Sequence, residues 1–297
     1  MGQLKATVVV PTTKDRGPLL FHSVGSILRQ SVTEIEVFII GDGVYDETRE
    51  AIKNIQAKDA RVKFFDHPKH ESRGETYRHQ ALQEAKGEIV CYLCDRDLML
   101  PNHIATLYAY LQDYDFASSN LINIAPDKTF GYAWSKTHFG SMDAQPHGLT
   151  GGASLTLSCV GHTLEFYRKL PFGWRTTPPG EFTDRHMWIQ FITHSKCRIF
   201  SGAYPTFLYF SRQGHPGWPV ARRLPELAYW SERIQRAGEV ESMLEQALGE
   251  LILERLAYKK ASLPKPLRIF GYEPRLIFQK ASQKVANLLK PPAKQTR

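Results

Sequence analysis

Hydrophobic positions in the first hundred residues switch repeatedly between a strand-like and a helix-like spacing. Short runs rich in β-branched and aromatic residues predict strands at 7–10, 36–40, 61–65 and 88–93. Between these runs, apolar residues recur every three or four positions, which predicts helices over 18–30, about 46–57 and 75–86. Strands that alternate with helices of this length are typical of a parallel, doubly wound sheet.

The remainder of the chain has a less regular pattern. We expect helices at 101–112, 163–170, 182–192, 225–235 and 239–260, and a last basic helix near 274–290. The run at 201–210 is interpreted as an edge strand, and 211–218 as a turn-rich loop. Residues 116–150 give no clear prediction, and the chain has no internal repeats.

Polar residues directly follow the apolar runs. Thr12 follows the first, Asp42 the second, and Asp95 and Asp97 the fourth. Parallel strands bring their carboxyl ends to one edge of the sheet, where ligands of open α/β proteins bind. Two carboxylates at such an edge favour a site for Mg²⁺ or Mn²⁺ with a substrate diphosphate. A turn stabilised by an ion pair is the alternative interpretation of the same residues.

The length and the charge of the chain indicate which kind of protein it is and which partners it could bind. The 297 residues, 42% hydrophobic, are enough for a large globular α/β domain with an appendage. The net charge of +8 arises in residues 251–297, which carry +9, whereas residues 1–250 carry −1. The basic segment has few aromatic residues that could stack on bases, so we expect a membrane surface or an acidic partner and no nucleic acid.

The compartment is predicted from what the sequence does not contain. Its apolar runs are too short to span a bilayer and no signal peptide is recognised, so a cytoplasmic location is expected, peripheral to the inner face of the membrane if the basic segment binds lipid. Cys91 and Cys94 match C-x-x-C without a second pair to complete a zinc site. We therefore predict four reduced, mostly buried thiols.

Four segments follow one another in a characteristic order: Val8–Thr13 with Arg16, Val37–Gly43 with Asp46, Glu84–Asp97 closing at Pro101, and Thr183–Gln190. In this order they resemble the inverting family 2 glycosyltransferases of GT-A fold, over about residues 4–215. Gly41 stands where the family's second segment has its first Asp. The resemblance implies a GT-A fold, that is, a doubly wound, Rossmann-like mixed sheet, here with a helical C-terminal extension.

The resemblance also implies roles for residues around the nucleotide. Asp42 would accept a hydrogen bond from uracil, although an Asp-Gly pair is also a common turn. Pro11 and Thr12 would form the wall of the base pocket. Arg16 and Arg78 could reach the phosphates, or could simply be solvated arginines on helices.

A divalent cation, Mn²⁺ or Mg²⁺, would be held by Asp95 and Asp97 and would neutralise the diphosphate leaving group. The sequence departs from the family here, because Arg96 replaces one carboxylate that can hold metal and Cys94 stands where Asp is frequent. Either Asp97 takes over the metal, or Arg96 supplies positive charge directly to the phosphates. His215 is a candidate third ligand, or an ordinary surface histidine.

The resemblance makes Asp184 the general base that takes the proton of the acceptor hydroxyl. The alternative is an N-cap of the helix that begins there. Glu181 is the reserve candidate. Trp174 and Glu181 are the predicted acceptor-binding residues, and Trp174 could instead shield the edge of the core.

We therefore expect a nucleotide-sugar-dependent glycosyltransferase domain at 1–220 and a helical, basic extension at 221–297. The enzyme would move a sugar from a UDP-sugar to a hydroxyl of a glycan or lipid-linked glycan. A non-catalytic nucleotide-sugar binding protein is the alternative, and a nucleotidyltransferase is disfavoured because no Gly-rich phosphate loop follows the first strand. The basic terminal helix would either lie at a membrane interface or pack on its own domain.

Overall fold

The structure is a computed structural model that describes residues 3–133, 155–262 and 278–284. The chain divides into two compact units, residues 1–251 and 252–297. The helix that follows residue 220 lies in the first unit, and the boundary predicted at that residue stays a prediction.

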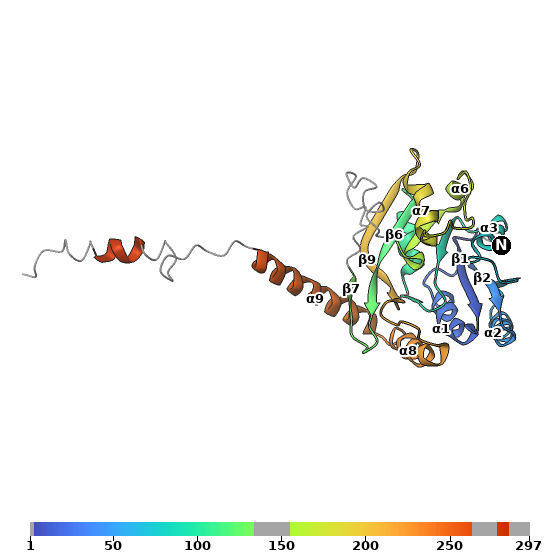
Figure 1. Ribbon diagram of the computed structural model, residues 1–297, viewed down its shortest axis with the longest axis horizontal. Coiled ribbons are helices and arrows are strands. Elements are labelled where there is room, and N and C mark those ends of the chain that lie inside the picture. Colours follow the sequence, from blue (N-terminus) through green and yellow to red (C-terminus); the bar gives the residue numbers. More distant parts are fainter. Residues whose placement is uncertain (1–2, 134–154, 263–277, 285–297) are drawn as a thin grey trace, which may run out of the picture. The chain divides into compact units, whose positions relative to one another are not determined.

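Nine strands of the described residues form one mixed sheet (Figure 1). They are β1 Ala6–Lys14, β2 Ile35–Val44, β3 Val62–His67, β4 Ile89–Tyr92, β5 Leu98–Met99, β6 Phe116–Ile124, β7 Phe130–Ala133, β8 Val160–Thr163 and β9 Ile199–Tyr209. Their order is β3-β2-β1-β4-β8-β6-β9-β5, with β7 paired to β6.

The first four strands in sequence pair in parallel, which confirms the doubly wound half predicted from the alternating pattern. The sheet then becomes mixed, because β8 pairs antiparallel with both β4 and β6. The predicted edge strand at 201–210 is wrong, since β9 lies between β6 and β5. Phe207 and Leu208 are buried accordingly, because this part of β9 has a partner on each side.

Helices cover both faces of the sheet. They are α1 Gly17–Leu28, α2 Asp46–Gln56, α3 Glu75–Gln83, α4 His103–Tyr110, α6 Leu164–Tyr167, α7 Thr183–Ile192, α8 Val220–Arg233 and α9 Glu239–Ser262. A single 3₁₀ turn, η1, spans Leu157–Cys159. Each matches a predicted helix except η1, which the sequence pattern did not indicate. The helix predicted near 274–290 lies mostly outside the described residues. Only 278–284 of this span are described, and they are helical.

Strand periodicity divides the core between the two faces of the sheet. Val8 and Val10 pack in one cluster with α1 and α2, whereas Val9 packs in another with α3 and α7. Figure 1 shows α1 and α2 on the side of the sheet opposite to α7. Burying each such side chain contributes about 1.5–3 kcal/mol, so the parallel strands are a stiff support for the residues at their ends.

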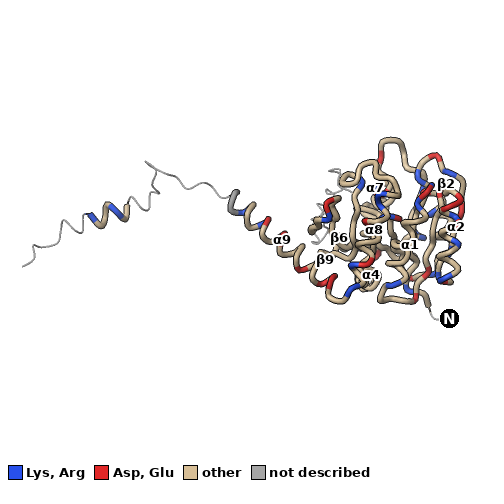
Figure 2. Tube along the Cα trace, turned by 90° about the horizontal axis from the view of Figure 1, so that it is seen from below, with Lys and Arg blue, Asp and Glu red and all other residues tan. Residues whose placement is uncertain are grey.

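The second unit contains the end of α9 and the helical residues 278–284. Leu253, Leu256 and Tyr258 of α9 are exposed. Residues 278–284 carry Lys280 and Lys284, coloured blue in Figure 2, and no acidic residue. Within the described parts of the chain, no helix combines the length and apolar character needed to cross a bilayer.

Candidate active site

The carboxyl ends of β1, β2 and the turn after β4 are joined by hydrogen bonds. Thr12 Oγ1 donates to Asp95 Oδ2 at 3.1 Å, and Thr13 Oγ1 donates to the Asp42 carbonyl at 2.6 Å. Thr12 pairs in register with Gly41, one residue before Asp42. The structure thus brings together Thr12, Asp42 and Asp95 at one edge of the sheet, as the strand pattern predicted.

Asp42 is held by the segment between β3 and α3. Its carboxylate accepts hydrogen bonds from Lys69 Nζ and from the His70 backbone N–H, both at 2.6 Å. Gly43 follows with φ of +65°, and a Cβ there would lie 2.6 Å from Lys69 Cβ. This close approach lets the segment fold over Asp42, so the Asp-Gly pair is both a turn and a binding-edge carboxylate.

Asp95 is paired with Arg16, which precedes α1. Nη1 of Arg16 lies 2.9 and 3.1 Å from the two carboxylate oxygens, and Asp95 is only 2% exposed. Both oxygens therefore already face a cation, and one of them also accepts the bond from Thr12.

Asp97 is a structural carboxylate. It is fully buried, and its oxygens accept hydrogen bonds from Ser158 Oγ at 2.6 Å and from the Phe210 backbone N–H at 3.1 Å. Ser158 Oγ also accepts a hydrogen bond from the Cys94 N–H at 3.0 Å. This bond connects η1 to the turn formed by residues 94–97, which we call the Asp turn. Burial raises the pKa of Asp97, against the lowering effect of Arg96 and these donors.

Arg96 points its guanidinium to the end of β9. Its Nε donates to the Phe210 carbonyl at 3.2 Å, so the backbone of one residue, Phe210, holds both Arg96 and Asp97. Burial acts to lower the pKa of Arg96, but the acidic groups of Cys94, Asp97 and Asp95 outweigh it and raise the pKa. The guanidinium is therefore a permanent positive charge beside the strand ends.

His215 lies in the loop 211–219 and does not join the aspartates. Its Nδ1 lies 3.0 Å from the Ser211 carbonyl and its Nε2 lies 3.0 Å from Glu226 Oε1 on α8. Both ring nitrogens of this buried side chain are thus engaged, which corrects its assignment as a third metal ligand. Its contacts instead close the loop against α8.

These contacts test whether the predicted residues suit Mn²⁺ or Mg²⁺. Such cations take one or two protein carboxylates whose oxygens are free to coordinate, together with substrate phosphates and water. Asp97 uses both oxygens to hold neighbouring segments, Asp95 is shared with Arg16, and His215 is latched to Glu226. No group of three His, Cys, Asp or Glu side chains among the described residues is arranged to hold a metal ion. The residues present do not fit the cation that the resemblance implies.

Arg78, on α3, is a buried cation rather than a solvated helix arginine. It is 5% exposed, its guanidinium lies 4.7 Å from the Trp174 ring centre, and Nη2 donates to the Arg73 carbonyl at 2.8 Å. Its Nε and Nη1 have no hydrogen-bond partner among the described residues. Burial lowers the pKa of Arg78, and the carboxylates of Asp184 and Glu75 oppose that change.

Trp174 belongs to the core, which corrects its assignment as an acceptor-binding residue. It is 2% exposed, and its indole N–H donates to the Tyr92 hydroxyl at 3.0 Å. Trp188 packs edge-on at 5.2 Å. With Arg78 over its ring, Trp174 has no face left for a sugar, and it serves to hold the arginine.

Asp184 lies in the first turn of α7, two residues after the N-cap Phe182, so it is not the cap itself. Burial raises its pKa, while Arg78, the Leu157 backbone N–H, Arg73 and Arg96 act to lower it. Asp184 is therefore close to the arginines of the site. Glu181 is exposed and lies 3.0 Å from His186, and its role in binding an acceptor stays a prediction.

Glu75 connects the two sides of the site and was not predicted from the sequence. Its carboxylate is 0% exposed and accepts hydrogen bonds from Ser72 Oγ at 3.0 Å, the Arg73 N–H at 3.0 Å and Thr177 Oγ1 at 2.8 Å. Thr183, the neighbour of Asp184, approaches at 3.5 Å. An acidic residue in the first turn of a helix resembles a simple dipole partner, so the pattern gave no signal of this cross-link.

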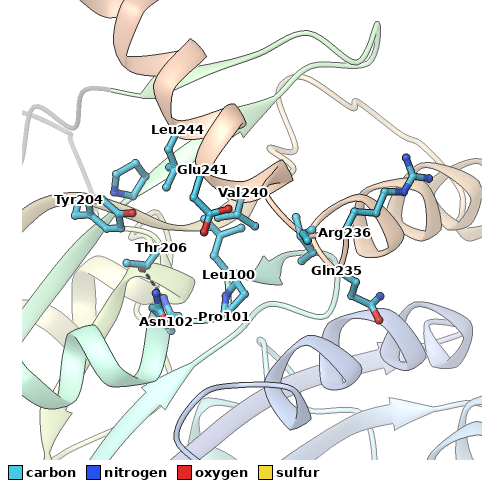
Figure 3. A pocket seen from close by; sticks show the side chains of 15 residues that line it. Leu100, Pro101, Asn102, Tyr204, Thr206, Gln235, Arg236, Val240, Glu241 and Leu244 are labelled. Carbon is cyan, nitrogen blue, oxygen red and sulfur yellow. Dashed lines mark hydrogen bonds between the residues drawn. The ribbon is translucent and has the colours of Figure 1, made fainter.

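A separate cavity of about 240 Å³ lies between the segment after β5, β9 and the α8–α9 connection (Figure 3). Leu100, Tyr204 and Glu241 are among its lining residues, and none of the predicted site residues is. His103 at its wall is buried and lies 2.6 Å from Thr206 Oγ1 through Nδ1. The candidate active site is thus the edge formed by β1, β2 and β4.

Comparisons with known proteins place this geometry in a family. The sequence model of Glycosyl transferase family 2 matches residues 7–170. A Campylobacter jejuni GalNAc(5)-diNAcBac-PP-undecaprenol β-1,3-glucosyltransferase is 31% identical over 103 residues, 35% of this chain and 33% of that protein. Glycosyltransferase GlyG of Streptococcus pneumoniae is 29% identical over 109 residues, 37% of this chain and 36% of that protein. The aligned part spans about a third of each relative.

Solved structures share the fold at low sequence identity. S. aureus TarS 1–349 in complex with UDP-GlcNAc aligns with a TM-score of 0.58 and 14% identity, over 82% of this chain and 72% of that chain. The mannosyltransferase PcManGT of Pyrobaculum calidifontis, in complex with GDP-Man and Mn²⁺, aligns with a TM-score of 0.51 and 16% identity, over 98% and 82%. The predicted GT-A fold is confirmed. The match over residues 7–170, on a sheet that gathers Thr12, Asp42 and Asp95 at one edge, means that this chain belongs to the family 2 glycosyltransferases.

Proposed function

We propose that this glycosyltransferase moves a sugar from a UDP-sugar, with inversion, to a hydroxyl of a glycan or lipid-linked glycan. One observation carries the proposal: Asp184, a partly buried carboxylate influenced by Arg78 and Arg96, lies near Cys94, and so does Asp95 of the strand-end edge that also holds Asp42. A base and a nucleotide edge in one site are what a direct displacement requires.

The nucleotide side of the proposal rests on Asp42. Lys69 and the His70 N–H fix its carboxylate, which retains lone pairs for the N–H of a uracil ring. Pro11 and Thr12 flank this position at the end of β1. The TarS structure with UDP-GlcNAc supports a UDP-sugar as donor, and the name of the Campylobacter relative, a glucosyltransferase, supports transfer of a hexose.

The chemical step follows from the position of Asp184. Its carboxylate takes the proton of the acceptor hydroxyl as that oxygen bonds to the anomeric carbon. The bond between the anomeric carbon and the diphosphate oxygen breaks on the opposite face, and its electron pair leaves with UDP. The two carboxylates expected to hold a divalent cation are engaged by Ser158, the Phe210 N–H and Arg16.

Arg78 tunes that base. Burial raises the pKa of Asp184, which makes the carboxylate a stronger proton acceptor, and the neighbouring Arg78 keeps it ionised. The acid limb of the pH–rate profile should therefore lie above the range of an ordinary aspartate. Arg78→Met, which removes the charge and keeps much of the length, should move that limb to higher pH.

The acceptor side is supported by charge and by one relative. The Campylobacter enzyme is named for an undecaprenol-linked substrate. Residues 251–297 of this chain carry a net charge of +9, which favours the anionic surface where lipid-linked acceptors reside. We infer peripheral contact with such a surface.

Calorimetric titration with UDP and GDP, followed by turnover assays with UDP-glucose and UDP-GlcNAc on lipid-linked acceptors, tests the proposal. UDP should bind more tightly than GDP, and Asp184→Asn should lose turnover while UDP binding is retained. Asp113→Asn, which changes an exposed aspartate elsewhere, is the matched control. Absence of UDP binding, or an Asp184→Asn protein with normal turnover, would refute the proposal.

A further inference from the structure

We propose that this enzyme holds and stabilises the donor diphosphate with arginine side chains instead of a divalent cation. The arginine cluster consists of five residues, each from a different segment, namely Arg16, Arg73, Arg96, Arg212 and Arg223. The proposal rests on the proposed function, because it concerns how the nucleotide diphosphate of the donor is bound.

Hydrogen bonds fix the Asp turn around Arg96. Both carboxylate oxygens of Asp97 accept hydrogen bonds, one from Ser158 Oγ and one from the Phe210 N–H. The Asp97 N–H donates to the Cys94 carbonyl at 3.0 Å and closes the turn. The Phe210 carbonyl then holds Arg96 by Nε alone. Neither Nη group of Arg96 has a hydrogen-bond partner among the described residues, and neither is a buried atom. A guanidinium fixed at Nε keeps its outer donors for a ligand.

The loop 211–219 supplies a second cation. Arg212 follows Phe210 by two residues, and its side chain has no hydrogen bond or ion pair within the described part of the chain. The latch between His215 and Glu226 fixes this loop, and Arg223 Nη2 donates to the His215 carbonyl at 2.9 Å. The loop that was expected to bring a metal ligand therefore brings Arg212.

Arg212 and Arg223 are repelled by other arginines of the cluster. Arg212 is exposed at the surface, and partial desolvation together with Arg96, Arg16 and Arg73 lowers its pKa. Partial burial, Arg96 and Arg16 lower the pKa of Arg223, against the opposing effect of Glu226 and Asp95. Asp95 pairs with Arg16 and Glu226 lies against His215, so both of these carboxylates already have a basic partner. A diphosphate would relieve this repulsion, since its oxygens accept paired N–H donors from several guanidinium groups.

Such a cluster can replace a metal ion in the transfer step. The leaving oxygen of UDP gains negative charge as its bond to the anomeric carbon breaks. Fixed guanidinium groups aimed at that oxygen and its neighbours stabilise the charge without rearranging. Unlike a metal, the arginines need no loading, so the site is complete as soon as the chain folds.

The test compares UDP and inorganic pyrophosphate binding by calorimetry in EDTA and in excess Mn²⁺, with and without the arginines. UDP should bind with the same affinity, within about threefold, in both conditions. Arg96→Ala should weaken UDP about ten- to a hundredfold, with no recovery in Mn²⁺, whereas Arg96→Lys should weaken it less. Arg236→Ala, which removes an exposed arginine of the α8–α9 connection, should have no effect.

Each other outcome has a defined meaning. Loss of UDP and pyrophosphate binding in EDTA, restored by Mn²⁺, would overturn the arginine cluster and leave the proposed function standing. Normal affinity of Arg96→Ala would also overturn it. Pyrophosphate binding in EDTA without UDP binding would instead support the cluster and refute the proposed donor. Electron paramagnetic resonance of Mn²⁺ with the enzyme alone should show the spectrum of the free ion.

Discussion

Replacing Glu75 by Gln tests the cross-link between the nucleotide segment and the base-carrying helix. The substitution keeps the shape of the side chain and removes its charge. Burial by itself would raise the pKa of Glu75. The N–H groups of Glu75 and Arg73 and the hydroxyls of Thr177 and Ser72 outweigh burial and lower the pKa to about 2.

The expected magnitude follows from that pKa. A fall from the usual 4.5 to about 2 corresponds to about 3 kcal/mol of stabilisation at neutral pH, at 1.36 kcal/mol for each unit. Because the folded-state pKa is depressed, this stabilisation is fully present above about pH 5 and is lost as the pH falls toward 2. Glu75→Gln should therefore lower the free energy of unfolding by about 2–3 kcal/mol at pH 7 and by much less near pH 2.

Urea unfolding of both proteins at pH 7, 5, 4 and 3 measures this difference. Glu47→Gln, which alters an exposed glutamate of α2, is the control and should stay within about 0.5 kcal/mol of wild type. If the gap between wild type and Glu75→Gln were the same at pH 3 and pH 7, the charge of Glu75 would not be what stabilises the fold. Turnover should fall with a smaller change in UDP affinity, because the cross-link positions Asp184.

Three further predictions concern buried groups. Ser158→Ala should lower the free energy of unfolding by about 1–3 kcal/mol in urea, because Asp97 and the Cys94 N–H each lose a partner; an unchanged value would contradict the structural role of Asp97. Trp174→Ala should cost about 3–5 kcal/mol and Trp174→Phe less, and equal thermal stability of all three proteins would place Trp174 outside the core. Cys91 and Cys159 are buried and free, and burial raises the pKa of the Cys159 thiol to about 12. Both should therefore react with a thiol reagent only after unfolding, and rapid reaction in the native protein would contradict their burial.

The parallel half of the fold was predictable because its signals are local. Runs such as Val8–Val10 and Glu36–Ile40 are short, apolar and bounded by Pro11 and Gly41, and the register of parallel strands then places Thr12 and Asp42 together. The mixed half was less predictable. Whether β9 lies at an edge depends on β5, a strand of two residues that no periodicity reveals.

Site residues were predictable where a strand end positions them and unpredictable where distant contacts do. Asp95 and Asp97 are separated by one residue and look equivalent in the sequence. In the structure Asp95 forms an ion pair with Arg16, whereas Asp97 accepts hydrogen bonds from Ser158 and the Phe210 N–H. His215 and Trp174 are residue types typical of binding sites. Only tertiary packing shows that both side chains are buried and hydrogen-bonded, His215 to Glu226 and Trp174 to Tyr92.

The bond between His215 and Glu226 has a consequence for engineering this enzyme. Helix α8, which brings Glu226, also buries Trp230 in a cluster with Leu19 and Leu208. Truncation at residue 220, or replacement of the chain after it, would remove Glu226. The loop that carries Arg212 would then lose its contact with α8. Met243 and Ala247 of α9 belong to the same cluster, so the smallest fragment expected to keep the loop 211–219 in shape extends beyond α8 into α9.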